Sequence, residues 1–198
     1  MTAADAPAVP EFRVLLVCTG NICRSPIVEQ VLRERLALPG VVFSSAGTAA
    51  IRGAMMPVEA AAVSIRLGGE PAGHRARPLE GWMVADADLI LTMSREHRSA
   101  VVRQHATAHR RAFTLREFER LLAGMSDEVG RDLSIPDALR ALVPRVAARR
   151  GVERAARPED LDIPDPYQRG RRAYERAGRL IDGATASISS DLSRRLER

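Results

Sequence analysis

A cysteine and an arginine stand at the two ends of one short segment, directly after an apolar stretch of the chain. The segment is Cys18-Thr19-Gly20-Asn21-Ile22-Cys23-Arg24. A cysteine thiolate is a nucleophile, and a guanidinium can bind two oxygens of a phosphate group at once. Because these two groups flank a glycine-containing loop, the segment indicates chemistry on phosphate or a similar oxyanion.

The residues on either side of this loop predict a strand before it and a helix after it. The apolar residues 14–17 have the length and the β-branched content of a strand that is buried on both faces. After the loop, Ser25 is a typical N-cap and Pro26 a typical first helical residue. Apolar residues then follow at helical spacing: Ile27, Val28, Val31 and Leu32. A loop between a strand and a helix N-terminus points backbone N–H groups at a bound anion.

This arrangement predicts a covalent reaction that needs no metal and no cofactor. We expect the thiol of Cys18 to ionise readily beside the helix N-terminus and Arg24. The thiolate would attack phosphorus to form a phosphocysteine, while Arg24 and the loop amides hold the phosphoryl oxygens. Ser25 would donate a hydrogen bond to the sulfur as it leaves. The residues expected to contact substrate in this segment are Thr19, Gly20, Asn21, Ile22, Cys23 and Ser25.

The composition of the 198-residue chain limits the partners that we expect. All 30 basic residues are arginines and the net charge is +5, which helps to attract anionic substrates. Aromatic residues make up only 4% of the chain, which argues against base-stacking surfaces and a nucleic-acid partner. No apolar stretch has the length of a membrane span, and the first residues lack a secretory pattern. We therefore expect a cytoplasmic monomer with residues 1–11 as a disordered leader.

Strand-like and helix-like segments alternate along most of the remaining chain. The expected strands are 41–45, 86–93 and 111–115, and the expected helices are 57–67, 94–104, 116–123 and 169–195. Such alternation predicts an α/β protein with a three-layer Rossmann-like fold, in which helices flank a four-stranded parallel sheet. Ligands of such sheets bind at the carboxyl ends of the strands, where we place Cys18, Gly47 and Ser94.

Residues 124–162 interrupt this alternation. They are rich in arginine and alanine, and their pattern fits two short helices at about 135–142 and 144–150. We interpret them as an insertion on the surface of a single domain that spans residues 12–198. We expect their arginines to form a solvated face rather than a partner or nucleic-acid surface: Arg145, Arg149, Arg150, Arg154 and Arg157.

A carboxylate for proton transfer follows the insertion, in the stretch Asp162-Ile163-Pro164-Asp165-Pro166-Tyr167. The two prolines stiffen this loop and hold the residue before each of them in an extended conformation. A carboxylate in a rigid loop is a candidate general acid. The pattern alone leaves three candidates for this role, Asp160, Asp162 and Asp165.

Four motifs of the chain together resemble those of the low-molecular-weight protein tyrosine phosphatases. They are, in the order of that family, Val17–Pro26, Ser45–Thr48, Leu89–Met93 and Asp165–Tyr167. The resemblance implies a small parallel α/β fold and hydrolysis of phosphotyrosine in a protein substrate, for example a bacterial tyrosine kinase. It implies Asp165 as the general acid and then the general base, and Tyr167 as a wall of the substrate pocket.

The same resemblance implies supporting roles for other residues near the loop. Asn21 would hold the loop by side-chain hydrogen bonds, in the left-handed backbone geometry that asparagine tolerates, and Ser45 would support it from the neighbouring strand. Cys23 would form a disulfide with Cys18 that protects the nucleophile reversibly from over-oxidation. The alternative for Cys23 is that it fills space. A host-cell substrate, reached by export without a signal, is the alternative to a cytoplasmic one.

The chain also departs from the family pattern. Ile51 and Arg52 stand where many members have an aromatic pocket residue, and Ser94 stands where many have aspartate. The sequence therefore leaves the substrate preference open, because this side of the pocket differs from that of many members. The histidines do not cluster as metal ligands would, and we interpret them as structural or surface residues: His74, His97, His105 and His109.

Three other functions fit part of the pattern. A thioredoxin-coupled arsenate reductase needs further cysteines, and none follows Cys23. Protein arginine phosphatases have a similar loop but carry threonine at the position of Ile22. The apolar side chain of Ile22 suits an aryl phosphate better than a phosphoguanidine. A non-catalytic phosphate-binding or nucleic-acid module would not need Cys18, Arg24 and Asp165 together. The sequence therefore favours a protein-tyrosine phosphatase.

Overall fold

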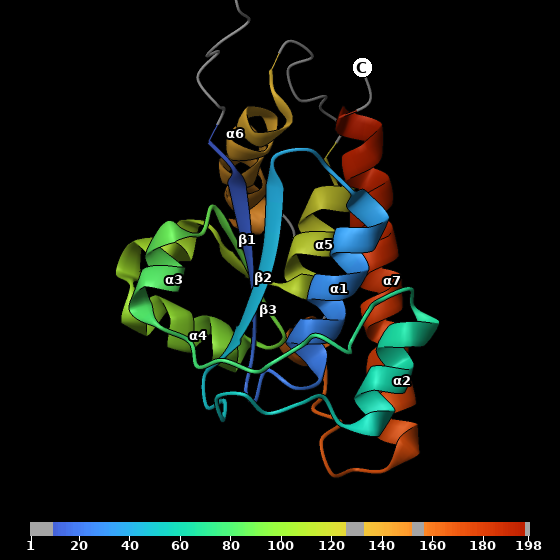
Figure 1. Cartoon of the computed structure of the whole chain (residues 1–198). Helices are drawn as coiled ribbons and strands as arrows, with labels where there is room; N and C mark the ends of the chain where they lie inside the picture. Colours follow the sequence, from blue (N-terminus) through green and yellow to red (C-terminus); the bar gives the residue numbers. More distant parts are fainter. Residues whose placement is uncertain (1–9, 126–132, 152–156, 197–198) are drawn as a thin grey trace, which may run out of the picture.

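Four parallel strands form one sheet at the centre of the chain, in the order β2-β1-β3-β4 (Figure 1). The computed structural model describes residues 10–125, 133–151 and 157–196. The strands are β1 (Phe12–Cys18), β2 (Val41–Gly47), β3 (Leu89–Thr92) and β4 (Ala112–Thr114). Each neighbouring pair runs parallel, and Cys18 pairs with Gly47 where β1 and β2 end. The sheet confirms the predicted α/β fold.

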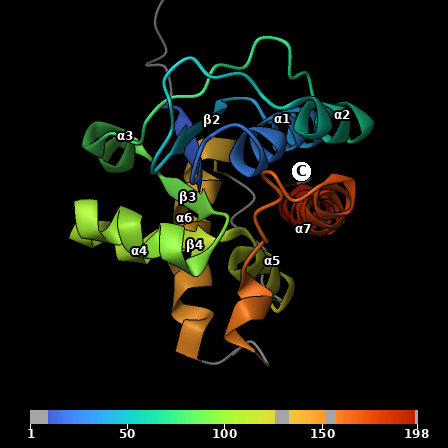
Figure 2. The ribbon, with the colours of Figure 1, turned by 90° about the horizontal axis from the view of Figure 1, so that it is seen from below.

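Helices cover both faces of this sheet (Figures 1 and 2). On one face lie α1 (Arg24–Leu36), α5 (Leu115–Ala123) and α7 (Arg171–Leu196), and on the other lie α3 (Gly81–Asp86) and α4 (Arg95–Gln104). The helix α2 (Val58–Arg66) packs against α1 and α7. Short 3-10 helices connect longer elements: η1 (Ala106–Arg110), η2 (Arg149–Gly151) and η3 (Pro158–Leu161). No helix in the described ranges is long and apolar enough to cross a membrane.

The side chains of β1 explain why both faces are covered. Val14 and Leu16 belong to the larger hydrophobic core with α1, α5 and α7. Leu15 and Val17 belong to the smaller core with α3 and α4. All four residues are at most 3% exposed. A strand that is apolar at every position is stable in the interior of a sheet with two covered faces, which is where β1 lies.

The strands all end at the same edge of the sheet, the lower edge in Figure 1. At this edge the chain leaves β1, passes through residues 19–23 and enters α1. The sheet continues from β1 to β2 on one side and to β3 on the other. A crevice opens at the carboxyl end of a strand where the strand order reverses in this way. The fold therefore places the loop after Cys18 where such sheets bind ligands.

Two element boundaries differ from the sequence expectations. The helix α1 begins at Arg24, with Cys23 as its N-cap residue and no side-chain cap. The hydroxyl of Ser25 contacts the sulfur of Cys18 instead of capping the helix, so Ser25 is not the N-cap that we predicted. The segment 81–86 forms α3, and β3 starts only at Leu89, because buried apolar residues of this segment pack on the sheet as a helix.

The insertion contributes to the core, so our expectation of a surface segment is wrong for its helix. A single helix, α6 (Ile135–Ala148), replaces the two short helices that we expected, and Pro144 lies inside it. Its apolar residues join the same core as α1 and α5: Leu139, Leu142, Val143 and Val146. Their helical spacing gives α6 an apolar face, and the hydrophobic effect drives that face into the protein. Residues 126–132 and 152–156, which include Arg154, and residues 1–9 of the leader lie outside the described residues.

Arg150 also differs from the solvated face that we predicted. It lies in η2, donates a hydrogen bond of 2.6 Å to the carbonyl of Ala112, and has its guanidinium carbon 4.0 Å from the centroid of the Phe113 ring. A cation over an aromatic face is held by the ring quadrupole. Arg150 therefore ties the insertion to β4, whereas Arg157 stays exposed as expected.

Candidate active site

The loop after β1 is shaped by its own backbone and by a glycine of β2. Asn21 has a φ of 52°, the left-handed conformation that asparagine tolerates. A Cβ atom on Gly47 would lie 2.4 Å from the carbonyl oxygen of Thr19, so only glycine fits there. The next residue, Thr48, donates its backbone N–H to the carbonyl of Cys18 at 2.9 Å. The end of β2 thus braces the loop.

Two hydrogen-bond donors lie against the sulfur of Cys18. The hydroxyl oxygen of Ser25 is 3.0 Å from Sγ, and the backbone N–H of Asn21 donates to Sγ at 3.3 Å. The Asn21 side chain donates to the hydroxyls of Ser25 and Ser45, at 3.0 and 2.8 Å. The Ser25 oxygen accepts from Asn21, and its own proton can be donated to the sulfur when Cys18 is a thiolate. As a thiolate, the sulfur would thus accept from both the Asn21 N–H and the Ser25 hydroxyl.

Arg24 stands at the first position of α1 with its guanidinium beside the loop. Its side chain is 5% exposed. Nη1 donates to the carbonyl of Ile163 at 3.0 Å, and Nη2 donates to Asp165 Oδ2 at 2.6 Å. Nε is buried and has no hydrogen-bond partner among the described residues. A buried N–H without an acceptor is unfavourable, and a bound oxyanion would supply that acceptor.

Asp165 reaches the loop from the segment between η3 and α7. Of the three aspartates that the sequence left open, it is the one that contacts Arg24 and lines the cavity above the thiol. Asp162 instead pairs with Arg95 at the start of α4, with 2.9 Å between Oδ2 and Nη2. Asp160 pairs with an arginine on the surface. The tertiary structure therefore separates candidates that lie within six residues of one another.

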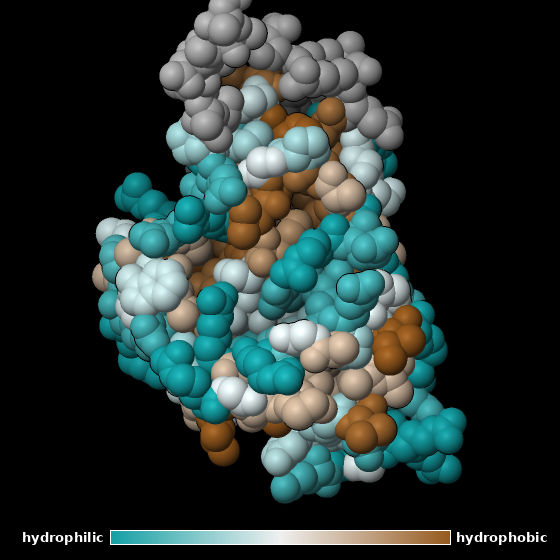
Figure 3. Space-filling model, viewed as in Figure 1, coloured by the Kyte–Doolittle hydropathy of each residue, from teal (hydrophilic) through white to brown (hydrophobic). Residues whose placement is uncertain are grey.

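A cavity of about 400 Å³ lies over Cys18 and Arg24. Most of its other lining residues are apolar: Ile22, Ala49, Ile51, Ala54, Met55, Met56, Pro57 and, with a polar hydroxyl, Tyr167. Ile51, Met55 and Tyr167 are 78%, 64% and 46% exposed, so apolar side chains reach from the mouth of the cavity into solvent. Figure 3 shows hydrophobic patches along the lower edge of the molecule, the edge at which the strands end. The cavity thus joins anion donors at its base to apolar walls.

The loop residues that the sequence predicted divide into two groups. Thr19, Gly20, Ile22 and Cys23 line the cavity. Asn21 and Ser25 are fully buried behind it. The Ser25 hydroxyl contacts the sulfur, and the Asn21 side-chain amide donates to that hydroxyl. Their side chains support the loop from behind and do not face the substrate site.

The comparisons with known proteins agree with this geometry. The family model described as "Low molecular weight phosphotyrosine protein phosphatase" matches residues 13–138. The chain belongs to this family. It is 31% identical over 182 residues to the low molecular weight protein-tyrosine-phosphatase Etp of Escherichia coli (strain K12). This alignment covers 91% of this chain and 95% of that protein. It is 40% identical over 106 residues to the probable low molecular weight protein-tyrosine-phosphatase EpsP of Ralstonia solanacearum. This alignment covers 54% of this chain and 72% of that protein.

A solved structure with a similar fold is that of the YwlE arginine phosphatase from Geobacillus stearothermophilus. The TM-score is 0.66 at 26% identity, over 92% of this chain and 94% of that one. The segment that matches the family model contains Cys18 and Arg24 and ends before Asp165. The assignment of Asp165 to the site therefore depends on its own sequence motif and on its contact with Arg24.

His97, which the sequence predicts to be a structural or surface residue, lies against the loop of this family member. His97 is 5% exposed, with Nε2 2.9 Å from Thr19 Oγ1 and Nδ1 2.8 Å from Ser94 Oγ. Burial and a neighbouring arginine lower the pKa of His97 to about 4, so its ring is neutral at pH 7. The sequence signal for this residue was its place in the first turn after the third strand. His74 Nε2 similarly lies 2.6 Å from the carbonyl of Asn21.

Cys23 has a different environment from Cys18, although both thiols line the cavity. It is 3% exposed, and its sulfur lies 3.9 Å from the hydroxyl of Tyr174. Burial raises the pKa of Cys23 to about 12. Cys23 is therefore a neutral thiol at pH 7.

Proposed function

We propose that the protein hydrolyses phosphotyrosine in phosphorylated proteins through a phosphocysteine intermediate. The observation that carries this proposal is the cavity above Cys18, which combines anion donors at its base with apolar walls. Phosphotyrosine has the same two parts, a phosphate dianion and an aromatic ring. Ile22 and Tyr167 both line the walls, and burial of the ring against them would contribute to binding.

In the first step, the Cys18 thiolate attacks phosphorus and forms an S–P bond, while the bond between phosphorus and the phenolic oxygen breaks. Arg24 binds two phosphoryl oxygens through Nε and Nη2, and the loop N–H groups bind the remaining one. Asp165, in its protonated form, donates a proton to the leaving oxygen, so that a neutral phenol departs. For this step, the phosphoryl group of the substrate has already replaced the Asp165 carboxylate on Nη2, where the carboxylate lies in this structure.

In the second step, water attacks the phosphocysteine. Asp165, now a carboxylate, accepts a proton from the water as the new P–O bond forms, and the S–P bond breaks with its electron pair on the sulfur. Ser25 donates a hydrogen bond to the departing sulfur, for which its hydroxyl is already placed at 3.0 Å. Release of inorganic phosphate returns the enzyme to its starting state.

We also propose that Cys23 protects Cys18 from irreversible oxidation. Peroxide would oxidise the Cys18 thiolate to a sulfenic acid, and the Cys23 thiol would condense with it to a disulfide and water. The support is that both thiols line the same cavity and that Cys23, as a neutral thiol, is not itself the first target of peroxide. After peroxide treatment, dithiothreitol should restore the wild type but not Cys23→Ala. Equal recovery of the two proteins would contradict this role.

A protein arginine phosphatase is the second candidate, because the solved structure named above is an arginine phosphatase. The side chain of Ile22 lines the cavity and offers no hydrogen bond to a guanidinium. A phosphoguanidine would leave its N–H groups without acceptors along the apolar walls, which weakens its binding. This difference favours tyrosine over arginine.

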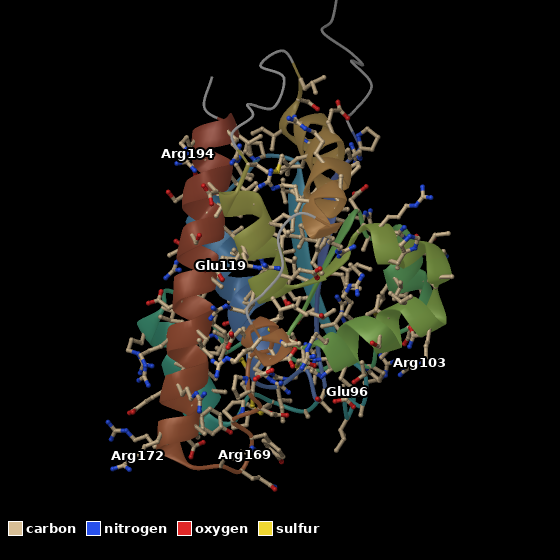
Figure 4. The ribbon with its side chains drawn as sticks, turned by 180° about the vertical axis from the view of Figure 1, so that it is seen from behind. Glu96, Arg103, Glu119, Arg169, Arg172 and Arg194 are labelled. Carbon is tan, nitrogen blue, oxygen red and sulfur yellow. The ribbon has the colours of Figure 1, made fainter. Side chains whose placement is uncertain are left out.

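For the partner, we infer a phosphorylated protein such as a bacterial tyrosine kinase, met in the cytoplasm by a monomer of this enzyme. Relatives of the chain are named as tyrosine phosphatases. Arg169 and Arg172 follow Tyr167 in the sequence and point outward at one end of α7 (Figure 4). Their charges would attract a negatively charged phosphoprotein to the mouth of the cavity.

The test is a comparison of kinetics on phosphotyrosine, phosphoarginine and phosphoserine peptides of one sequence. We expect kcat/KM on the phosphotyrosine peptide to be at least about 10-fold above the others, and the activity to survive a chelator. Cys18→Ser should have no turnover, since the serine hydroxyl is a far weaker nucleophile. An active Cys18→Ser protein would exclude the covalent mechanism.

The variant Ile22→Thr separates the two candidate functions. It places a hydroxyl on the cavity wall and should raise the ratio of phosphoarginine to phosphotyrosine turnover. An unchanged ratio would mean that Ile22 does not set the preference. If the wild type itself prefers phosphoarginine, the second candidate is the function of this protein.

A further inference from the structure

We propose that His97 orients the hydroxyl of Thr19 as a hydrogen-bond donor to the phosphoryl group of the substrate. Thr19 is then a phosphate-binding side chain, and His97 is its positioning residue. The basis is a continuous chain of contacts from Ser94 through His97 and Thr19 to Arg24, with distances of 2.8, 2.9 and 3.4 Å. The inference rests on the proposed phosphatase function of the same site.

Thr19 has the position that this role requires. It follows the proposed nucleophile Cys18 directly, lines the cavity and is exposed. Its Oγ1 lies 3.4 Å from Nη2 of Arg24, the same nitrogen that donates to Asp165. An oxyanion bound to Arg24 in place of the Asp165 carboxylate would therefore lie within reach of the Thr19 hydroxyl.

The protons of this chain of contacts can be counted. Ser94 Oγ accepts the backbone N–H of His97 at 3.3 Å and lies 2.8 Å from Nδ1, which either accepts the Ser94 proton or donates its own. If Ser94 donates to Nδ1, the single proton of the neutral ring is on Nε2 and is donated to Thr19. The Thr19 oxygen then accepts from His97 and from Arg24. Its own proton has no acceptor among the described residues and is free to point into the cavity.

The other tautomer would remove this donor. With the proton on Nδ1, the ring would donate to Ser94, and Thr19 would have to donate its proton to Nε2. The hydroxyl of Thr19 would then be turned from the substrate. The hydroxyl of Ser94, in the first case, both caps α4 and selects the tautomer that leaves the Thr19 proton available.

Burial of His97 makes the arrangement stable. The ring is 5% exposed, while Thr19 itself is exposed, so an unsupported threonine would rotate among its rotamers in solvent. A fixed donor does not lose this freedom when substrate binds, which strengthens binding of the phosphoryl group. Because burial also keeps the ring neutral at pH 7, the tautomer is the feature that decides the direction of the hydrogen bonds.

The test measures two quantities for each variant of the full chain. They are the binding of inorganic phosphate and the turnover of a phosphotyrosine peptide. Thr19→Val removes the hydroxyl and should weaken phosphate binding about 10-fold, the effect of a lost hydrogen bond to a charged group. Thr19→Ser should stay within about 2-fold of the wild type. His97→Phe should weaken binding like Thr19→Val, and the double variant should bind like either single one, because both changes remove the same contact.

A second threonine–histidine pair provides the control. Thr107 Oγ1 lies 2.9 Å from His105 Nδ1, away from the cavity. Thr107→Val and His105→Phe should leave phosphate binding and turnover unchanged. Unchanged phosphate binding in Thr19→Val, or a double variant with the product of the two single losses, would overturn the proposal. If His97→Phe does not fold, the comparison of Thr19→Val with Thr19→Ser decides alone.

The tautomer has a direct spectroscopic signature. Long-range proton–nitrogen NMR spectra of the wild type with bound phosphate should show His97 protonated on Nε2, and a proton on Nδ1 would overturn the proposal. Phosphate binding does not depend on catalysis. A wild type without turnover would therefore refute the proposed function, whereas full turnover with no effect of the Thr19 variants would refute only the role of Thr19 and His97.

Discussion

Arg24 Nη2 donates to Asp165 Oδ2 at 2.6 Å, and this contact joins two residues that are 141 positions apart in the chain. The guanidinium is buried, whereas the Asp165 side chain is 39% exposed and has room to turn. The carboxylate therefore occupies the donor that the proposed mechanism assigns to the phosphoryl group. The same aspartate would act as proton donor once the substrate has displaced it.

Asp165→Asn tests both consequences of this contact. Loss of the acid should lower kcat about 10²- to 10⁴-fold, and most for substrates with poor leaving groups. Loss of the competing charge should tighten binding of inorganic phosphate up to about 5-fold, since an ion pair with a partly exposed carboxylate contributes about 1 kcal/mol or less. Steady-state kinetics and phosphate titration measure the two effects separately.

Asp162→Asn is the matched control for that variant. Its carboxylate pairs with Arg95 outside the cavity, so kcat should change less than about 3-fold and phosphate binding should stay as in the wild type. A leaving-group dependence in Asp162→Asn, with none in Asp165→Asn, would show that the acid has been assigned to the wrong residue.

Gly47→Ala should damage the site from a neighbouring strand. The added Cβ would lie 2.4 Å from the carbonyl oxygen of Thr19 and 2.9 Å from the backbone nitrogen of Asn21. The loop has to move, so we expect a loss of about 1–3 kcal/mol of unfolding free energy and a fall in kcat/KM of about 10²-fold or more. Gly81→Ala, where a Cβ meets nothing within 4 Å, is the control. Normal activity of Gly47→Ala would mean that the brace on the loop is dispensable.

His97 should make the folded protein less stable in acid. Burial lowers its pKa to about 4, whereas the unfolded chain binds the proton near pH 6.5. Between these values the unfolded state holds more protons, so stability should fall as the pH drops from 6.5 toward 4 and then level off. The loss can reach about 3 kcal/mol. Urea unfolding at several pH values should show this slope in the wild type, and an equal slope in His97→Phe would exclude His97 as its source.

Arg150→Ala should lower stability without changing the chemistry. The arginine bonds to the carbonyl of Ala112 and covers the ring of Phe113, and it does not line the cavity. We expect a loss of about 2–3 kcal/mol of unfolding free energy, from a cation–π contact and hydrogen bonds of a charged group. Arg157→Ala, in an exposed pair, should cost less than about 1 kcal/mol. Thermal melts and kcat on an aryl phosphate measure the two quantities. Similar melting temperatures for the two variants would contradict the anchoring role of Arg150.

Local patterns in the sequence were enough to predict the sheet and the loop. A strand that is apolar at every position, such as β1, has to be covered on both faces, and alternation with helices then yields the parallel sheet. Cys18, Arg24 and the helix that follows lie within one strand-loop-helix unit, so their neighbourhood follows from chain geometry. The motif Asp165-Pro166-Tyr167 was recognised only by its resemblance to a family, because prolines fix a backbone without showing what it contacts.

The tertiary structure decided the contacts between segments that are far apart in the sequence. Helical spacing shows that α6 has an apolar face, but only packing shows which core receives that face, so the insertion was placed wrongly on the surface. Serine is a common helix cap, so its residue type does not show whether the Ser25 hydroxyl caps α1. In the structure this hydroxyl contacts the sulfur of Cys18 instead. His97 has no distinctive spacing, and its importance comes from burial against Thr19, a residue 78 positions away. Hydrogen bonds and burial depend on where side chains meet in space, which a local pattern does not contain.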